Sequence, residues 1–218
     1  MSLSPAVHIV IRATVINSGS NHSHILLIMF SKFSTQSVKL GQFNLTVVGN
    51  SELLNQPCIS VAGSRKIDSS SSMWLEDIIS QVRGHSVVSG LALGADAVAH
   101  NSAIVNGLPT IAVLPSGIDN IAPRSHLGLA MKILETGGAL VSQFPDNAKP
   151  NRNSFISRNE VIAMLGKMLL MPQCDKHSGT MHTCRFASKH NKTIVVQDAN
   201  YSGNRYLIND SAFHTISK

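Results

Sequence analysis

Four short segments of the chain carry residue types that bind phosphate groups. The first, "VAGSRK", combines Gly63, Ser64 and Arg65. The glycine permits a tight turn, the serine offers a hydroxyl and a backbone amide, and the arginine supplies a permanent forked charge. These are the components of a phosphate site, although a glycine turn followed by a solvated surface arginine has the same sequence.

The second segment is "SVVSGLALGADAVAH", in which Ser89 and Gly90 end an apolar run. A helix predicted to start near Gly94 would direct its free amides at this turn, and such a helix start attracts anions. Asp96 is predicted to be a first-turn carboxylate that complements the helix dipole rather than a catalytic group. His100 is interpreted as a packed core histidine rather than a base.

The third and fourth segments add cations, an aromatic ring and another helix start. In "RNSFISRNEVIAMLG", Arg152, Phe155, Arg158 and Asn159 are predicted to precede or open an apolar helix. Basic groups beside an aromatic suit single-stranded nucleic acid, although a solvated basic flank would look similar. In "CDKHSGTMHTC", a second phosphate could be held by the helix start at Ser178, Gly179 and Thr180. Together the four turns predict a phosphate-binding groove.

Several kinds of chemistry lack their sequence patterns. The chain has no G-x-G-x-x-G fingerprint, Walker motif or G-x-S-x-G elbow, so we expect no enzyme of those types. Cys58, Cys174 and Cys184 are far apart, which favours a reducing cytoplasm over a disulfide framework or zinc ribbon. The histidines of "HSH", residues 22–24, have no second cluster at ligand spacing, so we expect no metal and no cofactor.

Composition and periodicity predict an α/β fold in which helices cover a parallel sheet. Of 218 residues, 43% are hydrophobic and 14% charged, and the net charge of +6 favours an anionic partner. Apolar runs predict strands over 44–48, 58–63, 86–90, 110–115, 139–144, 167–172 and 193–197. Helical spacing marks 73–80, 94–105, 126–137 and 180–190. In such a fold, ligands bind beyond the carboxyl ends of the strands.

The first part of the chain is harder to interpret. We divide the sequence into an N-terminal extension of uncertain structure, residues 1–42, and one domain, residues 43–218. Within the extension, residues 7–16 have strand character. The apolar run at 25–30 is far shorter than the ~20 residues that span a bilayer, so it is predicted to be a buried strand and no membrane partner is expected.

The order of five segments resembles the DNA-processing protein A family, also called DprA or Smf. These are "ELLNQPCISVAGSR", "VVSGLALGADAVAH", "TIAVLPSGIDNIAP", "FISRNEVIAMLG" and "HSGTMHTCRFASKHNKTIVV", within residues 43–198. The resemblance implies a Rossmann-like domain, with a mostly parallel sheet and helices on both faces. It also implies a cytoplasmic, dimeric, non-enzymatic protein that binds single-stranded DNA in a basic pocket. It also implies a role in natural transformation and recombination, protecting the strand and loading the recombinase RecA.

Carried over residue by residue, the resemblance implies that the four predicted turns form that pocket, with Arg152 as a basic contact and Phe155 as the aromatic one. The chain departs from the family at Leu93, where a basic residue is usual, and at Glu160, where an arginine is usual. Both departures are predicted to reduce positive charge in the groove and to flatten the salt dependence of binding. Ala122 and His126 replace a usual tyrosine and asparagine. The chain is expected to be a bare core domain without the winged helix that many members carry.

Two alternatives remain open. One is a phosphoribohydrolase of the related "lonely guy" type, whose motif P-G-G-x-G-T-x-x-E supplies a catalytic glutamate. The corresponding segment here is "KHSGTMHTC", with Thr183 near the glutamate position and no carboxylate to stabilise an oxocarbenium-like centre. The other is a nucleotide-sensing module of the same superfamily. Only a DNA binder should gain affinity with strand length.

Overall fold

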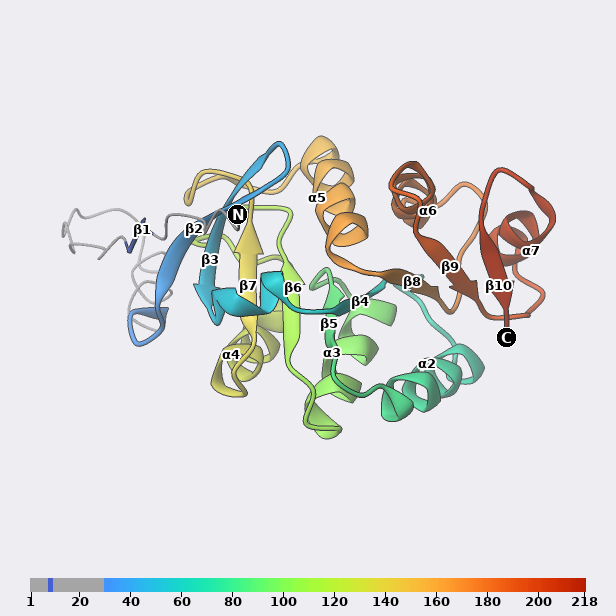
Figure 1. Ribbon diagram of the computed structural model, residues 1–218, viewed down its shortest axis with the longest axis horizontal. Coiled ribbons are helices and arrows are strands. Elements are labelled where there is room, and N and C mark those ends of the chain that lie inside the picture. The colour runs from blue at the N-terminus through green and yellow to red at the C-terminus, as the bar shows by residue number, and fades with distance from the viewer. Residues whose placement is uncertain (1–7, 10–29) are drawn as a thin grey trace, which may run out of the picture.

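One mixed sheet forms the centre of the computed structural model, which describes residues 8–9 and 30–218 (Figure 1). Within these residues the strand order is β1-β2-β3-β7-β6-β5-β4-β8-β9-β10. Neighbouring strands from β7 to β10 are parallel, whereas β1, β2 and β3 pair antiparallel with their neighbours and with β7. The strands are β1 (His8–Ile9), β2 (Thr35–Leu40), β3 (Phe43–Gly49), β4 (Cys58–Val61), β5 (Ser86–Ser89), β6 (Thr110–Val113), β7 (Ala139–Ser142), β8 (Met168–Met171), β9 (Thr193–Val196) and β10 (Thr215–Ser217).

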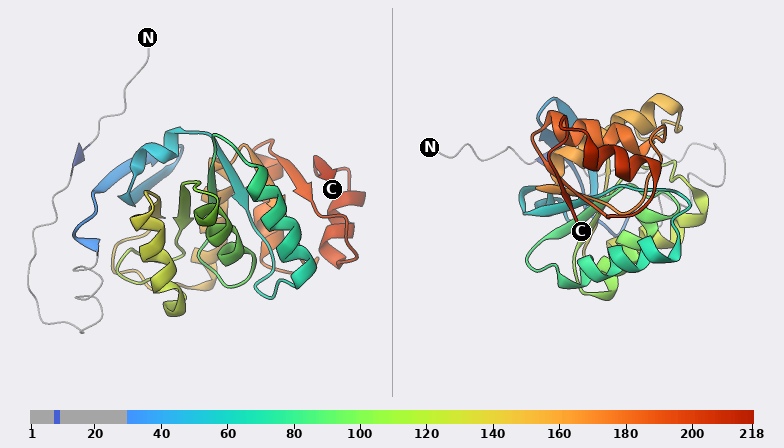
Figure 2. Two further views of the ribbon diagram at one scale, coloured as in Figure 1. Left: turned by 90° about the horizontal axis from the view of Figure 1, so that it is seen from below. Right: turned by 90° about the vertical axis from the view of Figure 1, so that its right-hand side faces the viewer.

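Helices cover both faces of the sheet (Figure 2). One face carries α2 (Ser69–Gln81), α3 (Ala95–Val105) and α4 (Leu127–Glu135), and the opposite face carries α5 (Arg152–Leu165), α6 (Thr180–Lys189) and α7 (Ser202–Asn209). Two short 3-10 helices, η1 (Ser51–Asn55) and η2 (Arg124–His126), lie in the connections. Strands β4, β5, β6 and β7 are buried along their whole length, as expected for parallel strands covered on both sides.

Side-chain alternation along the strands divides the core between the two faces. Val87 of β5 packs in a cluster with Leu75 of α2 and Ala99 of α3, whereas its neighbour Val88 packs in a cluster with Val161 of α5. Successive strand residues point to opposite faces, so continuous apolar runs serve both helical layers. The α/β, Rossmann-like prediction is confirmed, and within residues 43–218 each predicted strand and helix corresponds to an observed one.

Strands β2 and β10, helix α7 and the two 3-10 helices were not predicted, and the predicted start of α5 is wrong. Helix α5 begins at Arg152 rather than after Arg158, because Asn151 caps it. The Asn151 side chain accepts from the Ser154 amide at 3.0 Å, and the Ser154 hydroxyl accepts from the Asn151 amide at 2.9 Å. This capping box fixes the start a full turn and a half earlier.

The N-terminal expectations fall largely outside the described residues. Of the strand-like segment 7–16 only His8–Ile9 is described, as β1, and the histidines 22–24 lie outside. Of the apolar run only Phe30 is described; it is buried, at 4% exposed, but it is helical, so the prediction of a strand is wrong at this residue. Strand β2 lies within the predicted extension yet pairs with β3, and the division at residue 43 stays a prediction. No helix among the described residues has the length and apolar character to cross a bilayer. Cys58, Cys174 and Cys184 are free and buried.

Candidate nucleic-acid interface

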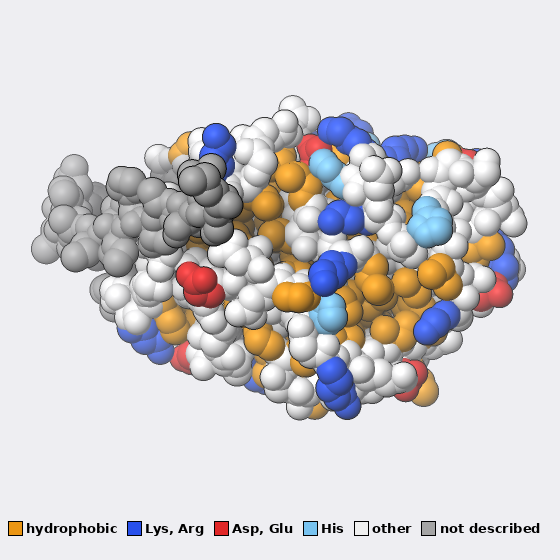
Figure 3. All heavy atoms as spheres, in the orientation of Figure 1, with side chains coloured by type: hydrophobic (Ala, Val, Ile, Leu, Met, Phe, Trp, Pro, Cys, Tyr) orange, Lys and Arg blue, Asp and Glu red, His pale blue; other side chains and the backbone are white. Residues whose placement is uncertain are grey.

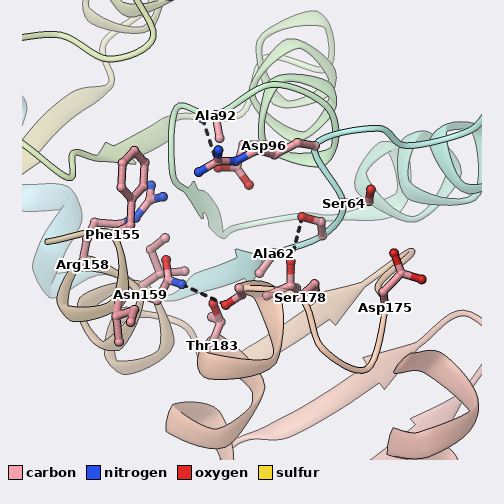
Figure 4. A pocket seen from close by; sticks show the side chains of 16 residues that line it. Ala62, Ser64, Ala92, Asp96, Phe155, Arg158, Asn159, Asp175, Ser178 and Thr183 are labelled. Atoms are coloured by element: carbon pink, nitrogen blue, oxygen red, sulfur yellow. Dashed lines mark hydrogen bonds between the residues drawn. The ribbon is translucent and has the colours of Figure 1, made fainter. Parts of the chain in front are cut away.

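A cavity of about 450 Å³ lies where the parallel strands β4, β5 and β8 end. Its walls come from the segments that follow these strands, from one side of α5 and from the start of α6 (Figure 4). The lining residues are Ala62, Gly63, Ser64, Arg65, Ala92, Asp96, Phe155, Ile156, Arg158, Asn159, Ile162, Asp175, Ser178, Gly179, Thr180 and Thr183. The site thus occupies the edge of the sheet that the sequence predicted.

The turn after β4 leaves a hydroxyl and a guanidinium for a ligand. The Ser64 amide donates to the Gln173 carbonyl at 2.8 Å, so it is already occupied. The Ser64 hydroxyl accepts from the Lys66 amide at 3.0 Å, which leaves its proton free to donate. Arg65 is exposed. A Cβ on Gly63 would lie 2.6 Å from the Ala95 side chain, so only glycine fits this close approach to α3.

The start of α3 supports this turn, and its Asp96 side chain lines the cavity. The Ala95 amide donates to the Ser64 carbonyl at 3.0 Å, and the Ala92 amide donates to Asp96 Oδ2 at 3.1 Å. Gly94, at φ +73°, packs so closely that a Cβ would overlap the Ser64 carbonyl oxygen. Asp96 is therefore a first-turn carboxylate, as predicted, and two of the amides expected to face an anion have protein partners.

Ser89 and Gly90 lie behind the cavity. Ser89 is fully buried and its hydroxyl donates to the Val61 carbonyl at 2.9 Å, which ties β5 to β4. Gly90 packs directly under the Arg158 guanidinium and the Asp96 carboxylate, where a Cβ would overlap both. Neither residue lines the cavity itself, but Gly90 packs against two residues that do.

His100 is also part of the interior. It is fully buried, with Nδ1 2.7 Å from Thr110 Oγ1 and Nε2 3.3 Å from the Gly90 carbonyl oxygen. Burial lowers the pKa of His100 to about 4. A neutral, enclosed imidazole of this kind confirms the interpretation as a core histidine.

Arg158 is a buried cation on the wall of the cavity. Its side chain reaches from α5 to donate through Nη1 to the Val113 carbonyl at the end of β6, at 2.8 Å. The residue is 4% exposed, and its Nε has no hydrogen-bond partner. Burial lowers the pKa of Arg158, whereas Asp96 raises it and Arg65 lowers it. Because a guanidinium stays charged in proteins, the buried Nε is an unsatisfied donor in the wall of the cavity, and an acceptor that reached it would remove the cost of leaving it unpaired.

The ring of Phe155 lies close to both arginines that line the cavity. The centre of its ring is 5.0 Å from Arg65 Cζ and 6.0 Å from Arg158 Cζ. Phe155 and Arg158 are three residues apart on α5 and therefore share one side of the helix, and Figure 4 shows their side chains next to each other.

The start of α6 closes the opposite wall. Thr180 Oγ1 donates to the Gly63 carbonyl at 3.0 Å, and Asn159 Nδ2 reaches the Gly179 carbonyl at 3.5 Å. The Ser178 hydroxyl is buried without a partner. An unpaired hydroxyl at a helix start adds a second polar group that a phosphate oxygen could satisfy.

The charge of the lining differs from the prediction. Arg65 and Arg158 are balanced by two carboxylates, Asp96 and Asp175, so the lining as a whole is formally neutral. Asp175 was not predicted as a site residue, although its place after β8 is the signal that could have found it. Lys and Arg side chains are instead spread over the face shown in Figure 3, some of them near its centre.

The interpretation of Glu160 as a groove residue is wrong. Its side chain is 11% exposed and lies 2.9 Å from Lys189 Nζ and 3.2 Å from His190 Nε2, on the side of α5 that faces α6. Burial raises the pKa of Glu160, but hydrogen bonds from Lys189 and His190 outweigh it and hold the pKa below its usual value. Leu93 is 51% exposed and lies beside the lining residue Ala92 without itself lining the cavity.

The structure brings together nine of the thirteen predicted site residues. Those that line the cavity are Gly63, Ser64, Arg65, Phe155, Arg158, Asn159, Ser178, Gly179 and Thr180. Ser89, Gly90 and Gly94 lie behind it, and Arg152 is exposed at the start of α5, away from the lining.

Comparison with known proteins identifies the family. Residues 34–218 match the model of the DNA recombination-mediator protein A family. Protein Smf of Escherichia coli K12 is 38% identical over 153 residues, which cover 69% of this chain and 41% of that protein. The chain spans 35% to 60% of the length of this and two further curated relatives.

Solved structures give the same result. DNA processing protein A of Helicobacter pylori, whose structure was described for its single-stranded DNA binding mode, superposes with a TM-score of 0.77 at 26% identity over 85% of this chain and 91% of that chain. The protein from Streptococcus pneumoniae superposes with a TM-score of 0.75 at 25% identity over 88% of this chain and 74% of that chain. The family match covers most of the sequence and all of the cavity, and the chain therefore belongs to the DNA recombination-mediator protein A family.

Proposed function

We propose that this protein binds single-stranded DNA through the cavity at the ends of β4, β5 and β8. The observation that carries the proposal is Arg158, a cation that lines the cavity together with Arg65 and whose buried Nε has no hydrogen-bond partner. A phosphate oxygen is the acceptor that best matches an unpaired guanidinium donor. The same cavity offers the unpaired Ser178 hydroxyl. The binding mode described for the Helicobacter pylori relative supports this choice of ligand.

The size of the cavity indicates how a strand would be held. A volume of about 450 Å³ is at the lower end of ligand cavities and accommodates roughly one nucleotide, so the rest of a strand would run over the rim. A homodimer with two such sites on one strand would bind more tightly than either site alone. We therefore propose a dimeric, cytoplasmic protein acting in DNA uptake and recombination, which protects the strand and passes it to RecA without a chemical step of its own.

The second candidate function is a small-nucleotide site, with or without hydrolysis. The fit of a single nucleotide to the cavity favours it. Hydrolysis is disfavoured because Thr183 occupies the position at which the phosphoribohydrolases carry glutamate. Asp96, a carboxylate of the lining, already accepts a hydrogen bond from the Ala92 amide through Oδ2. A nucleotide sensor would bind AMP without gaining affinity for longer strands.

The test is fluorescence anisotropy of labelled oligo-dT of several lengths at two salt concentrations. It compares the wild type with Arg65→Ala and with Lys66→Ala, a neighbouring exposed cation that does not line the cavity. Loss of one phosphate contact on a single strand should reduce the salt slope by about 0.7 in Arg65→Ala. Lys66→Ala should retain the slope of the wild type.

Competitors separate the two candidate functions. Binding that rises with strand length and resists AMP supports the DNA reading. Binding that is independent of length and displaced by AMP contradicts it and assigns the cavity to a small nucleotide. Release of ribose 5-phosphate from AMP would contradict the non-enzymatic role.

A further inference from the structure

One residue outside the cavity holds both ends of the turn that carries Arg65. This turn runs from Ser64 to Asp68, between β4 and α2. The backbone carbonyl of Gln173 accepts a hydrogen bond from the Ser64 amide at 2.8 Å, and its side-chain Oε1 accepts one from the Asp68 amide at 2.9 Å. The turn after β4 is thus fastened at its two ends to the segment that follows β8.

The far end of the turn, Asp68, has two further partners. Its carboxylate accepts a hydrogen bond from the Ser71 amide at 2.9 Å, which caps α2, and another from the hydroxyl of Tyr201, the residue before α7. The hydrogen bond from Tyr201 and those from the amides of α2 lower the pKa of Asp68. Because the carboxylate is ionised at neutral pH, it accepts both bonds, and the end of the turn is tied to α2, to α7 and to Gln173.

Gln173 is itself held in place by α7. Asn204 of that helix is fully buried, and its side chain donates to the Pro172 carbonyl and accepts from the Cys174 amide, each at 2.9 Å. The two residues that flank Gln173 are therefore fixed by one buried amide group. A buried polar side chain whose groups are paired is a rigid support.

Arg65 depends on such support more than the other arginine of the lining does. Arg158 is anchored by its own bond to the Val113 carbonyl at 2.8 Å. Arg65 is exposed, and its place at the cavity follows from the backbone that carries it. A long side chain loses rotamer freedom when it binds a phosphate, and a backbone that had to be ordered at the same time would add to this loss.

We propose that Gln173 is a positioning residue that holds the turn after β4 in the conformation from which Arg65 binds a phosphate of the strand. This inference rests on the proposed function. Gln173 does not line the cavity. Its side chain acts through the Asp68 amide, so loss of Oε1 should free one end of the turn while the other end stays bonded to the Gln173 backbone.

The experiment removes the acceptor and keeps the approximate size of the side chain. Gln173→Leu and Gln173→Met lack Oε1, whereas Gln173→Glu retains an acceptor. Gln36→Leu is the matched control, because Gln36 Oε1 also accepts one hydrogen bond, from the Ser51 hydroxyl at 2.7 Å, and lies on β2 outside the lining.

Each variant is measured in three ways. Amide hydrogen exchange, followed by NMR without DNA, reports on the turn itself. Oligo-dT anisotropy at two salt concentrations gives the affinity and the salt slope, and urea unfolding shows that the variant is folded. Gln173→Leu is also combined with Arg65→Ala, because a residue that acts through Arg65 loses its effect when Arg65 is replaced.

We expect the Asp68 amide of Gln173→Leu and Gln173→Met to exchange about 2- to 10-fold faster than in the wild type, the range of one hydrogen bond, while the Ser64 amide keeps its rate. Oligo-dT affinity should fall by a factor in the same range, and the salt slope should decrease by up to about 0.7 as the phosphate contact of Arg65 weakens. Gln173→Leu should cause no further loss in the Arg65→Ala background. Gln173→Glu should keep the Asp68 amide slow and lose less affinity, and Gln36→Leu should match the wild type in exchange and binding.

Other results overturn the proposal. An unchanged exchange rate of the Asp68 amide in both acceptor-free variants shows that Oε1 does not fix the turn. Faster exchange with unchanged oligo-dT affinity shows that binding does not need a fixed turn. A loss that persists in full after Arg65→Ala assigns Gln173 a role independent of Arg65. If the wild type binds no strand, the proposed function fails and this inference with it, whereas a wild type that binds and variants that bind equally well refute the inference alone.

Discussion

Replacement of Gly94 by alanine should disrupt the turn at residues 63–65, against which Gly94 packs. Gly94 lies directly before α3 at φ +73° and ψ −125°. A Cβ there would overlap the Ser64 carbonyl oxygen and lie 2.6 Å from the Arg65 carbonyl carbon. Both contacts are backbone atoms, which cannot swing aside as a flexible side chain can. The Ser64 carbonyl is also held in place by the Ala95 amide.

The size of the effect follows from two contributions. A residue other than glycine in this sparsely populated backbone region costs about 1–3 kcal/mol, and overpacking against fixed atoms costs a further 1–3 kcal/mol or so. We therefore expect Gly94→Ala to lower the free energy of unfolding by roughly 2–6 kcal/mol, within the ~5–15 kcal/mol that a domain has available.

A matched control separates these contributions. Gly107 has a similar φ of +68°, and a Cβ there would meet nothing within 4 Å. Urea unfolding, followed by the fluorescence of the single tryptophan Trp74, should show a larger loss for Gly94→Ala than for Gly107→Ala by about 1–3 kcal/mol. Oligo-dT affinity should fall only in Gly94→Ala, because relaxation of the overlap moves Arg65. Equal stability losses and unchanged affinity in both variants would refute the argument.

Three further predictions follow from the site and its surroundings. The buried ring of His100 has a pKa of about 4, whereas the histidine of the unfolded chain has a pKa of about 6.5. As the pH falls from about 7 to about 5, the unfolded chain therefore takes up a proton that the folded protein does not, and the free energy of unfolding should decrease by about 2 kcal/mol. Urea unfolding should show this pH dependence, and His100→Gln should abolish it. Glu160→Gln should lower the free energy of unfolding by about 1–2 kcal/mol, because the carboxylate pairs with Lys189. Anisotropy should show an unchanged affinity for oligo-dT, and a changed affinity would indicate that Glu160 does contribute to the groove. Leu93→Lys should strengthen binding and steepen the salt slope by up to about 0.7, if the exposed position beside Ala92 can reach a phosphate; an unchanged slope would place it off the strand path.

Helix α5 shows where sequence reasoning stopped. Phe155, Arg158 and Glu160 all lie within six residues, and the sequence grouped them around one groove. Residues two apart on a helix face different directions, so Arg158 points to the cavity while Glu160 points to α6. The signal for the correct helix start was present in the sequence, as Asn151 followed three residues later by Ser154. The side of α5 that meets the sheet depends on packing.

The segment after β5 shows a different limit. Ser89, Gly90 and Gly94 follow a strand as phosphate-binding residues do, and their positions at the sheet edge were predicted correctly. Their contacts depend on neighbours far away in the chain: Val61 for the Ser89 hydroxyl, Arg158 for Gly90 and Ser64 for Gly94. No local pattern distinguishes a glycine that approaches a ligand from one that approaches another part of the backbone.

By itself the sequence determined the alternation of strands and helices, the edge of the sheet that carries the site, and the family, because periodicity, turn chemistry and motif order are properties of neighbouring residues. Tertiary structure alone decided which side chains meet. The cavity joins segments near residues 63, 96, 158 and 178, and their side chains point inward or away according to which groups can be buried with partners. That balance left Arg158 Nε and Ser178 Oγ unpaired in the cavity, turned Glu160 towards Lys189, and set Phe155 against two guanidiniums.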